Sequence, residues 1–232
     1  MTRSMDNLSI PRRWAMHDLK DYLFYQDDWA TIYCGDCREI LPLLEPVDLV
    51  LTDPPYGIGY DRNKKHKGNV INPTVIGDDN PFDPSPLFRF HNLILWGANC
   101  YASRLPDCKT WLAWHKTMTS NDDGQTADME LAWSNCVERS RLFQYLWAGC
   151  YRQGENGEYY HPTQKPTALM RWCILLCDDA QIILDPFMGS GTTLLAAKNL
   201  NRKSIGIEIE PKYCEISVKR LRQEVFDFRK TA

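Results

Sequence analysis

A carboxylate, two prolines and an aromatic ring follow one another at Asp53, Pro54, Pro55 and Tyr56. They come directly after an apolar run, residues 47–52, that is typical of a buried strand. Because neither proline has a backbone N–H and both have a fixed φ, the turn is stiff and offers only acceptors. The Asp53 carboxylate and the Pro54 carbonyl could together hold an exocyclic amino group, while a planar base stacks on Tyr56. The alternative is a plain turn with Tyr56 on its rim.

A glycine-rich turn follows a second apolar stretch, residues 182–184. It runs from Asp185 to Thr193 and leads into an apolar segment that predicts a helix. A strand, a tight glycine turn and a helix N-terminus favour nucleotide binding. The turn lacks the lysine of a phosphate-binding loop and the third glycine of a dinucleotide fingerprint. The negative charge of Asp185 instead suits a ligand that carries positive charge.

An acidic residue, Glu208, ends a third apolar stretch, residues 204–208. Nucleotide-binding folds place a ribose-binding acid about 20 residues beyond the start of the glycine turn. The alternative for Glu208 is a solvated carboxylate at a strand end. Taken with Asp185, the spacing indicates a positively charged cofactor that contains adenosine, and S-adenosylmethionine fits best.

The whole set of motifs resembles a known family. Residues 52–56, residues 161–166 (His-Pro-Thr-Gln-Lys-Pro) and residues 185–193, in this order, are similar to the β class of DNA amino-methyltransferases. That class modifies adenine N6 or cytosine N4. The resemblance covers about residues 31–221 and implies a Rossmann-like methyltransferase fold in circularly permuted order, with the catalytic motif before the cofactor motif.

The resemblance also implies roles for individual residues. Catalysis is expected at Asp53, Pro54, Pro55 and Tyr56, where hydrogen bonds would direct the lone pair of the target nitrogen toward a sulfonium methyl. Cofactor contacts are expected at Asp36, Thr163, Lys165, Asp185, Phe187, Gly189, Gly191, Thr192 and Glu208. Asp36 would contact adenine, and Thr192 and Lys165 the methionine carboxylate. For Lys165 the alternative is an exposed loop lysine. No metal is expected, because the pair Cys34 and Cys37 has no second pair to complete a site.

DNA, in double-stranded form, is the expected partner, and the target base must leave the stack to react. Since the net charge is −3, DNA must be held by a local basic patch. The densest basic run contributes Arg62, Lys64, Lys65 and Lys67 and would contact phosphates, which the salt dependence of DNA binding would test. The alternative is a solvated face. A homodimer is compatible with the sequence.

The target base follows from Asp53. Aspartate rather than serine at this position favours adenine N6 over cytosine N4 by analogy with the family. A catalytically inactive DNA-binding relative is a further alternative. Only residues 148–160 separate the central strands from the motif at 161–166, so target recognition is either short or has moved to the loop at 57–86.

Alternating apolar and amphipathic segments predict an α/β fold with a mostly parallel, seven-stranded sheet and helices on both faces. Strands are expected at residues 31–34, 47–52, 92–96, 110–114, 143–147, 181–185 and 204–208, and helices at 37–44, 167–177, 192–200 and 211–225. With 232 residues and no internal repeat, one domain is expected, with an N-terminal extension at 1–30 and a candidate DNA-contacting loop at 57–90.

The nine cysteines are not preceded by a secretory signal, and no run is long enough to span a membrane. Reduced thiols and a cytoplasmic location, in a prokaryotic or phage-infected cell, are therefore expected.

Overall fold

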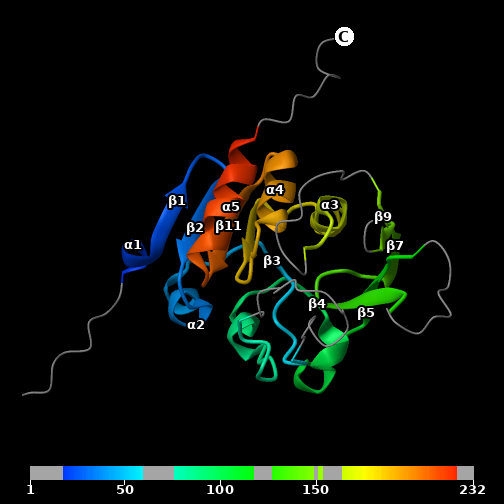
Figure 1. Cartoon of the computed structure of the whole chain (residues 1–232). Helices are drawn as coiled ribbons and strands as arrows, with labels where there is room; N and C mark the ends of the chain where they lie inside the picture. Colours follow the sequence, from blue (N-terminus) through cyan, green and yellow to red (C-terminus); the bar gives the residue numbers. More distant parts are fainter. Residues whose placement is uncertain (1–17, 60–75, 118–126, 149–150, 154–163, 224–232) are drawn as a thin grey trace, which may run out of the picture.

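The computed structural model describes residues 18–59, 76–117, 127–148, 151–153 and 164–223 (Figure 1). Among these residues, nine strands form one sheet in the order β1-β2-β11-β10-β3-β4-β6-β5-β7. They are β1 (Leu23–Gln26), β2 (Ala30–Cys34), β3 (Leu49–Thr52), β4 (Leu93–Trp96), β5 (Thr110–His115), β6 (Met129–Ser134), β7 (Arg141–Gln144), β10 (Ile182–Asp185) and β11 (Lys203–Glu208). A separate hairpin pairs β8 (Trp147–Ala148) with β9 (Tyr151–Arg152).

The centre of the sheet is parallel. Strands β2, β11, β10, β3 and β4 pair in parallel with one another. Strand β6 is antiparallel to both of its neighbours, β4 and β5, and β1 is antiparallel to β2. Every residue of β3 and β4 is buried, as expected of central strands that are covered on both faces.

Helices cover both faces of the sheet. Helices α3 (Thr167–Leu176), α4 (Thr192–Asn199) and α5 (Pro211–Arg222) lie together on one face (Figure 1). There Leu49 and Ile183 pack with Leu169 of α3 and Ala196 of α4. On the other face, Val50, Leu184 and Ile207 pack against a second set of elements. These are α2 (Cys37–Ile40) and the short 3₁₀ segments η1 (Leu41–Leu43) and η3 (Ser85–Arg89).

The remaining short elements lie at the ends of these layers. Helix α1 (Leu19–Tyr22) precedes the edge strand β1, and the 3₁₀ segments η4 (Ala98–Cys100) and η5 (Ala102–Arg104) follow β4. No helix in the part of the chain that the structure describes is long and apolar enough to cross a membrane.

Each predicted strand has a counterpart, but the expected number of strands was wrong. The sheet has nine strands rather than seven, because β1 and β6 were not predicted. Strand β1 lies within the predicted N-terminal extension and is largely exposed at the sheet edge. Strand β6 begins Met-Glu-Leu-Ala, which are good helix formers, and its strand conformation comes from pairing on both sides.

The predicted helices are also present, with shorter bounds. The helix expected at 37–44 breaks into α2 and η1 at Pro42, which has no N–H to donate within a helix. The helix expected at 211–225 ends at Arg222, because Gln223 is its extended C-terminal cap, and residues 224–225 lie outside the described part. The single-domain organisation and the circular permutation stay predictions.

The parallel strands direct their carboxyl ends to one edge of the sheet. Asp36 follows β2, Glu208 ends β11, Asp185 ends β10, and Asp53 follows β3. Because β6 is antiparallel, its first residues, including Glu130, reach the same edge. Ligands bind at this edge in open α/β sheets, so the fold gathers the candidate residues where a site is expected.

Candidate active site

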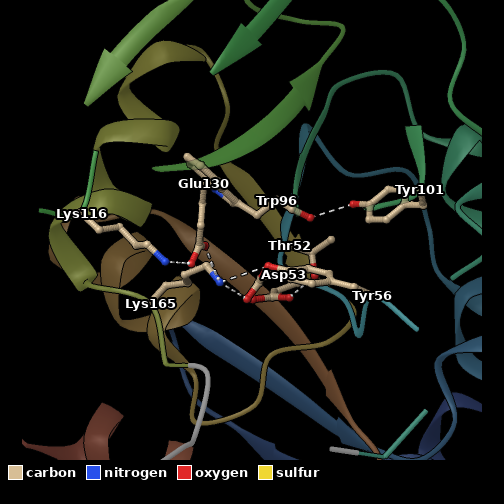
Figure 2. Close-up of polar contacts among 9 residues, drawn as sticks. Thr52, Asp53, Tyr56, Trp96, Tyr101, Lys116, Glu130 and Lys165 are labelled. Carbon is tan, nitrogen blue, oxygen red and sulfur yellow. Dashed lines mark hydrogen bonds and ion pairs between the residues drawn. The ribbon is translucent and has the colours of Figure 1, made fainter. Parts of the chain in front are cut away.

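The turn after β3 places Asp53 at the centre of a polar cluster (Figure 2). The Tyr56 hydroxyl donates a hydrogen bond to Asp53 Oδ1 at 2.5 Å. Lys165 Nζ donates to Asp53 Oδ2 and lies 3.4 Å from the Tyr56 hydroxyl. The turn therefore holds a carboxylate that is fixed by a phenol on one oxygen and an ammonium on the other.

Lys165 is shared between two carboxylates. Its Nζ lies 3.0 Å from Glu130 Oε2, and Glu130 Oε1 accepts a hydrogen bond from Lys116 Nζ at 2.7 Å. The side chains of Lys165 and Asp53 are only 8% and 14% exposed. Buried charges persist where they are paired, and the order Lys116, Glu130, Lys165, Asp53 alternates in sign along the whole cluster (Figure 2).

The pairing sets the protonation of the cluster. Burial raises the pKa of Asp53, and the ammonium of Lys165 opposes that rise. Burial would lower the pKa of Lys165, but the carboxylates of Asp53 and Glu130 raise it above its ordinary value. Burial likewise opposes ionisation of Glu130, yet Lys165 and Lys116 bring its pKa down to about 2. Lys165 and Glu130 are therefore charged, and the ionisation of Asp53 depends on Lys165.

Tyr56 is held by close contact with the backbone after β4. Gly97 has a φ of +66°, and a Cβ at this position would lie 1.9 Å from Tyr56 Cε1. Burial raises the pKa of Tyr56 well above its ordinary value, so the hydroxyl stays a donor toward Asp53. The neighbouring Tyr101 donates a hydrogen bond to the Trp96 carbonyl at 2.8 Å and fixes the backbone just before Gly97 (Figure 2).

Gly97→Ala is expected to displace the Tyr56 ring. The added methyl group clashes with the ring, and the positive φ disfavours any residue with a Cβ. We expect the free energy of unfolding to fall by roughly 1–3 kcal/mol, as measured by thermal unfolding. Gly59→Ala is a matched control for stability, because Gly59 also has positive φ but, among the described residues, no atom lies within 4 Å of an added Cβ. Equal losses in both variants would mean that the Tyr56 contact has no role.

A buried hydrogen bond joins the start of the turn at 53–56 to the glycine-rich turn. Thr52 Oγ1, immediately before Asp53, donates to Asp185 Oδ1 at 2.7 Å. Asp185 also accepts the Phe187 N–H at 3.2 Å. Burial raises the pKa of Asp185 to about 6, although the hydroxyl groups of Thr193 and Thr52 oppose the rise. The two turns are therefore neighbours at the ends of the adjacent strands β3 and β10.

The other acidic residues of the edge are held by local hydrogen bonds. Glu208 accepts the N–H groups of Gly189 at 3.0 Å and Glu210 at 2.9 Å. Burial raises the pKa of Glu208. Asp36 caps α2 and pairs with the Arg38 guanidinium at 2.5 Å, which lowers the pKa of Asp36. Phe187 meets Phe82 edge to face, with ring centroids 5.5 Å apart.

The start of α4 packs against α5. Arg220, which is buried, donates hydrogen bonds to the Ser190 carbonyl at 2.6 Å and to Thr192 Oγ1 at 3.1 Å. Gly191 has a φ of +77°, and a Cβ there would lie 2.7 Å from Ser217 Oγ. The glycine at 191 is thus required by contact with α5, and the Thr192 hydroxyl is already engaged by Arg220.

The structure brings together Asp53, Tyr56, Lys165 and Asp185, with Glu208 and Asp36 farther along the same edge. Lys165 was expected to face a cofactor carboxylate, whereas its ammonium lies between Asp53 and Glu130. The cofactor contacts stay predictions. The remaining candidates lie outside the described residues, and they are Thr163, Arg62, Lys64, Lys65 and Lys67.

Two members of the cluster were missed by sequence reasoning, Glu130 and Lys116. A signal was present, since both are charged residues that border a polar loop between two aromatic-rich segments. This signal can be interpreted only when the pairing of β5 with β6 is known. That pairing sets His115 beside Met129, and so brings the adjacent Lys116 and Glu130 together. In the described part of the chain, no group of three or more His, Cys, Asp or Glu residues could hold a metal ion.

Known proteins share both the sequence pattern and the fold. A family model described as DNA methylase, of the N6/N4 type, matches residues 89–219, which is more than half of the chain. The Type II methyltransferase M.HinfI of Haemophilus influenzae is 27% identical over 208 residues. That match covers 88% of this chain but 53% of the relative, so the chain spans about half the length of M.HinfI.

Solved structures agree on the fold. The M1.HpyAVI–SAM complex is 27% identical with a TM-score of 0.53, and the match covers 82% of this chain and 99% of that one. The PvuII DNA methyltransferase, described as cytosine-N4-specific, has a TM-score of 0.58 over 88% of this chain and 90% of its own. At 17% identity, the second likeness shows the fold alone. The chain itself, by its match over residues 89–219, belongs to the DNA methylase family.

Proposed function

We propose that the protein transfers a methyl group from S-adenosylmethionine to the exocyclic N6 of adenine in DNA. The observation that carries the proposal is the hydrogen bond from Thr52 to Asp185, which sets the amino-group acceptor turn beside the glycine-rich turn. Membership of the DNA methylase family supports the reaction class. The likeness to the M1.HpyAVI–SAM complex supports the cofactor.

The side chains at the sheet edge fit this cofactor by their chemistry. Asp36, Asp185 and Glu208 lie at the carboxyl ends of the neighbouring strands β2, β10 and β11. Carboxylates suit an ammonium group and ribose hydroxyls, and they would repel the phosphates of a nucleotide. When bound, S-adenosylmethionine supplies an electrophilic methyl group on a sulfonium centre. These three carboxylates and the N–H groups of the glycine-rich turn would hold it.

The target amino nitrogen is a poor nucleophile, because its lone pair is delocalised into the ring of the base. Asp53 and the Pro54 carbonyl would accept its two hydrogens and favour a pyramidal nitrogen. Tyr56 and Lys165 hold the Asp53 carboxylate in place while this happens. After transfer, the nitrogen must lose a proton, and Asp53 is the nearest base in the cluster. Catalysis is then mainly positioning and electrostatics.

The proposed partner is duplex DNA, from which the target base must be extruded to reach Asp53. Unstacking costs a few kcal/mol, which stacking against an aromatic ring partly offsets. The Tyr56 ring has one side against Gly97, so a base would stack on the other side. Phosphate contacts by the basic run at 62–67 would supply the salt-dependent part of the affinity.

The identity of the modified base is tested directly by product analysis. DNA incubated with the protein and S-adenosylmethionine labelled in its methyl group is digested to nucleosides and separated. We expect label in N6-methyladenine, with none in N4-methylcytosine, and no label transferred to RNA in a parallel reaction. Label in N4-methylcytosine would overturn the choice of adenine. Label in RNA alone would overturn DNA as the substrate.

A further inference from the structure

Two cysteine thiols lie in contact on the side of the sheet away from the active site. The Sγ atoms of Cys136 and Cys177 are 3.0 Å apart. Cys136 follows the end of β6, and Cys177 is the C-terminal cap of α3. The two residues are far apart in the chain and are brought together by the packing of α3 on the sheet.

The surroundings of Cys136 and Cys177 favour oxidation of the two thiols. Both cysteines are half-buried at the margin of the core on the α3 face. Cys136 Sγ lies 3.5 Å from Ser134 Oγ. The Cys177 thiol lowers the pKa of Cys136 to about 7, with help from the Ser134 hydroxyl and against the effect of burial. The contact with Cys136 raises the pKa of Cys177.

We infer that Cys136 and Cys177 form a redox-active dithiol that a peroxide closes to a reversible disulfide. The geometry carries the inference, since the two sulfur atoms are already in contact at 3.0 Å and a disulfide needs them to approach to about 2 Å. In a reducing compartment such a pair is a modification site rather than a permanent crosslink. The disulfide would change the stability of the protein, whichever base the protein methylates.

The chemistry balances with hydrogen peroxide as the oxidant. The Cys136 thiolate attacks one peroxide oxygen, breaks the O–O bond and becomes a sulfenic acid, and hydroxide leaves and takes up a proton as water. The Cys177 sulfur then attacks the sulfenic sulfur, the S–O bond breaks, and the Cys177 proton leaves with the hydroxide as a second water. Two thiols are oxidised by two electrons in total, and one peroxide is reduced to two waters.

The disulfide would join two elements that are already joined at their other ends. Glu130 near the start of β6 pairs with Lys165, which immediately precedes Pro166 and α3. Cys136 and Cys177 lie at the opposite ends of the same two elements. Six residues of extended chain separate Glu130 from Cys136, about 20 Å, so the bond should change stability more than catalysis.

Oxidation of the protein tests the inference. The reduced protein is treated with one equivalent of hydrogen peroxide, its free thiols are alkylated, and its peptides are analysed by mass spectrometry. We expect a linked peptide that contains Cys136 and Cys177, and a Tm about 5–10 °C higher than that of the reduced protein. Dithiothreitol should reverse both changes.

Matched variants separate this pair from the other thiols. Cys136→Ser and Cys177→Ser should each lose the linked peptide and the rise in Tm. Cys108→Ser should behave as wild type, because the Cys108 thiol donates to the Thr110 carbonyl and contacts no other thiol in the described part of the chain. The inference is overturned if Cys177→Ser keeps the rise in Tm. It is equally overturned if the wild type yields Cys136 only as a sulfinic acid or pairs it with Cys173.

Discussion

Replacing Asp53 with alanine will lower the rate of methyl transfer by about 10²- to 10³-fold or more while S-adenosylmethionine binding is retained. The loss follows from removing the proposed acceptor of the amino group, an effect of the size seen when one preorganised hydrogen-bonding group is deleted. The variant should still fold. Lys165 keeps an ion pair with Glu130 at 3.0 Å, so no buried charge is left alone.

Two measurements and two further variants make this prediction specific. Single-turnover rates report the chemical step, and calorimetric titration reports cofactor affinity. Asp53→Asn keeps the side-chain volume but removes the charge, and it should lose most of the same rate. Glu215→Ala, an exposed carboxylate on α5, is the matched control and should transfer methyl groups as wild type does. A wild-type rate in Asp53→Ala would mean that the amino group is held elsewhere.

The parts of the site that are continuous in sequence could be predicted, because a short segment carries its own chemistry. Asp53 to Tyr56 were recognised from two prolines and a carboxylate, and Asp185 from the glycines that follow it. The edge they share was predictable too, since parallel strands of a doubly covered sheet end on the same side. Strand β3 and strand β10 were expected and are adjacent.

The parts of the site that depend on packing between distant segments could not be predicted. Nothing in the sequence around Lys165 shows whether its ammonium pairs with a carboxylate of the protein, such as Asp53, or with a carboxylate of a ligand. Gly191 belongs to a ligand-binding pattern, yet its lack of a Cβ is required by Ser217 of α5. Glu130 lies on β6, which begins with residues that favour a helix. Its strand conformation follows from pairing with β4 and β5, which the sequence does not show.

The shared position of Lys165 has a consequence for the dependence of the reaction on pH. In the proposed mechanism Asp53 must be ionised to accept the amino group, so we expect the rate to fall as pH drops through the pKa of Asp53. Burial raises that pKa, Lys165 lowers it, and Glu130 raises it. Opposite effects of a cation and an anion on one carboxylate can be separated by removing each in turn.

Lys165→Met and Glu130→Gln are therefore expected to move the acidic limb of the rate profile in opposite directions. Without the ammonium, the burial of Asp53 is unopposed, its pKa rises further, and the limb should move to higher pH. Without the Glu130 carboxylate, the pKa of Asp53 falls and the limb should move to lower pH. Glu130 keeps Lys116 as a partner at 2.7 Å in the first variant, which favours folding.

The profiles are measured as single-turnover rates at saturating cofactor. Saturation matters because Asp185, on the proposed cofactor side, has a pKa raised to about 6, and its titration would otherwise change the amount of cofactor bound across the profile. Tyr56 stays protonated throughout, since burial holds its pKa well above its ordinary value. General damage to the cluster would lower the rate in both variants without separating their limbs. Shifts in the same direction would therefore refute the assignment of Lys165 and Glu130 as opposing controls on Asp53.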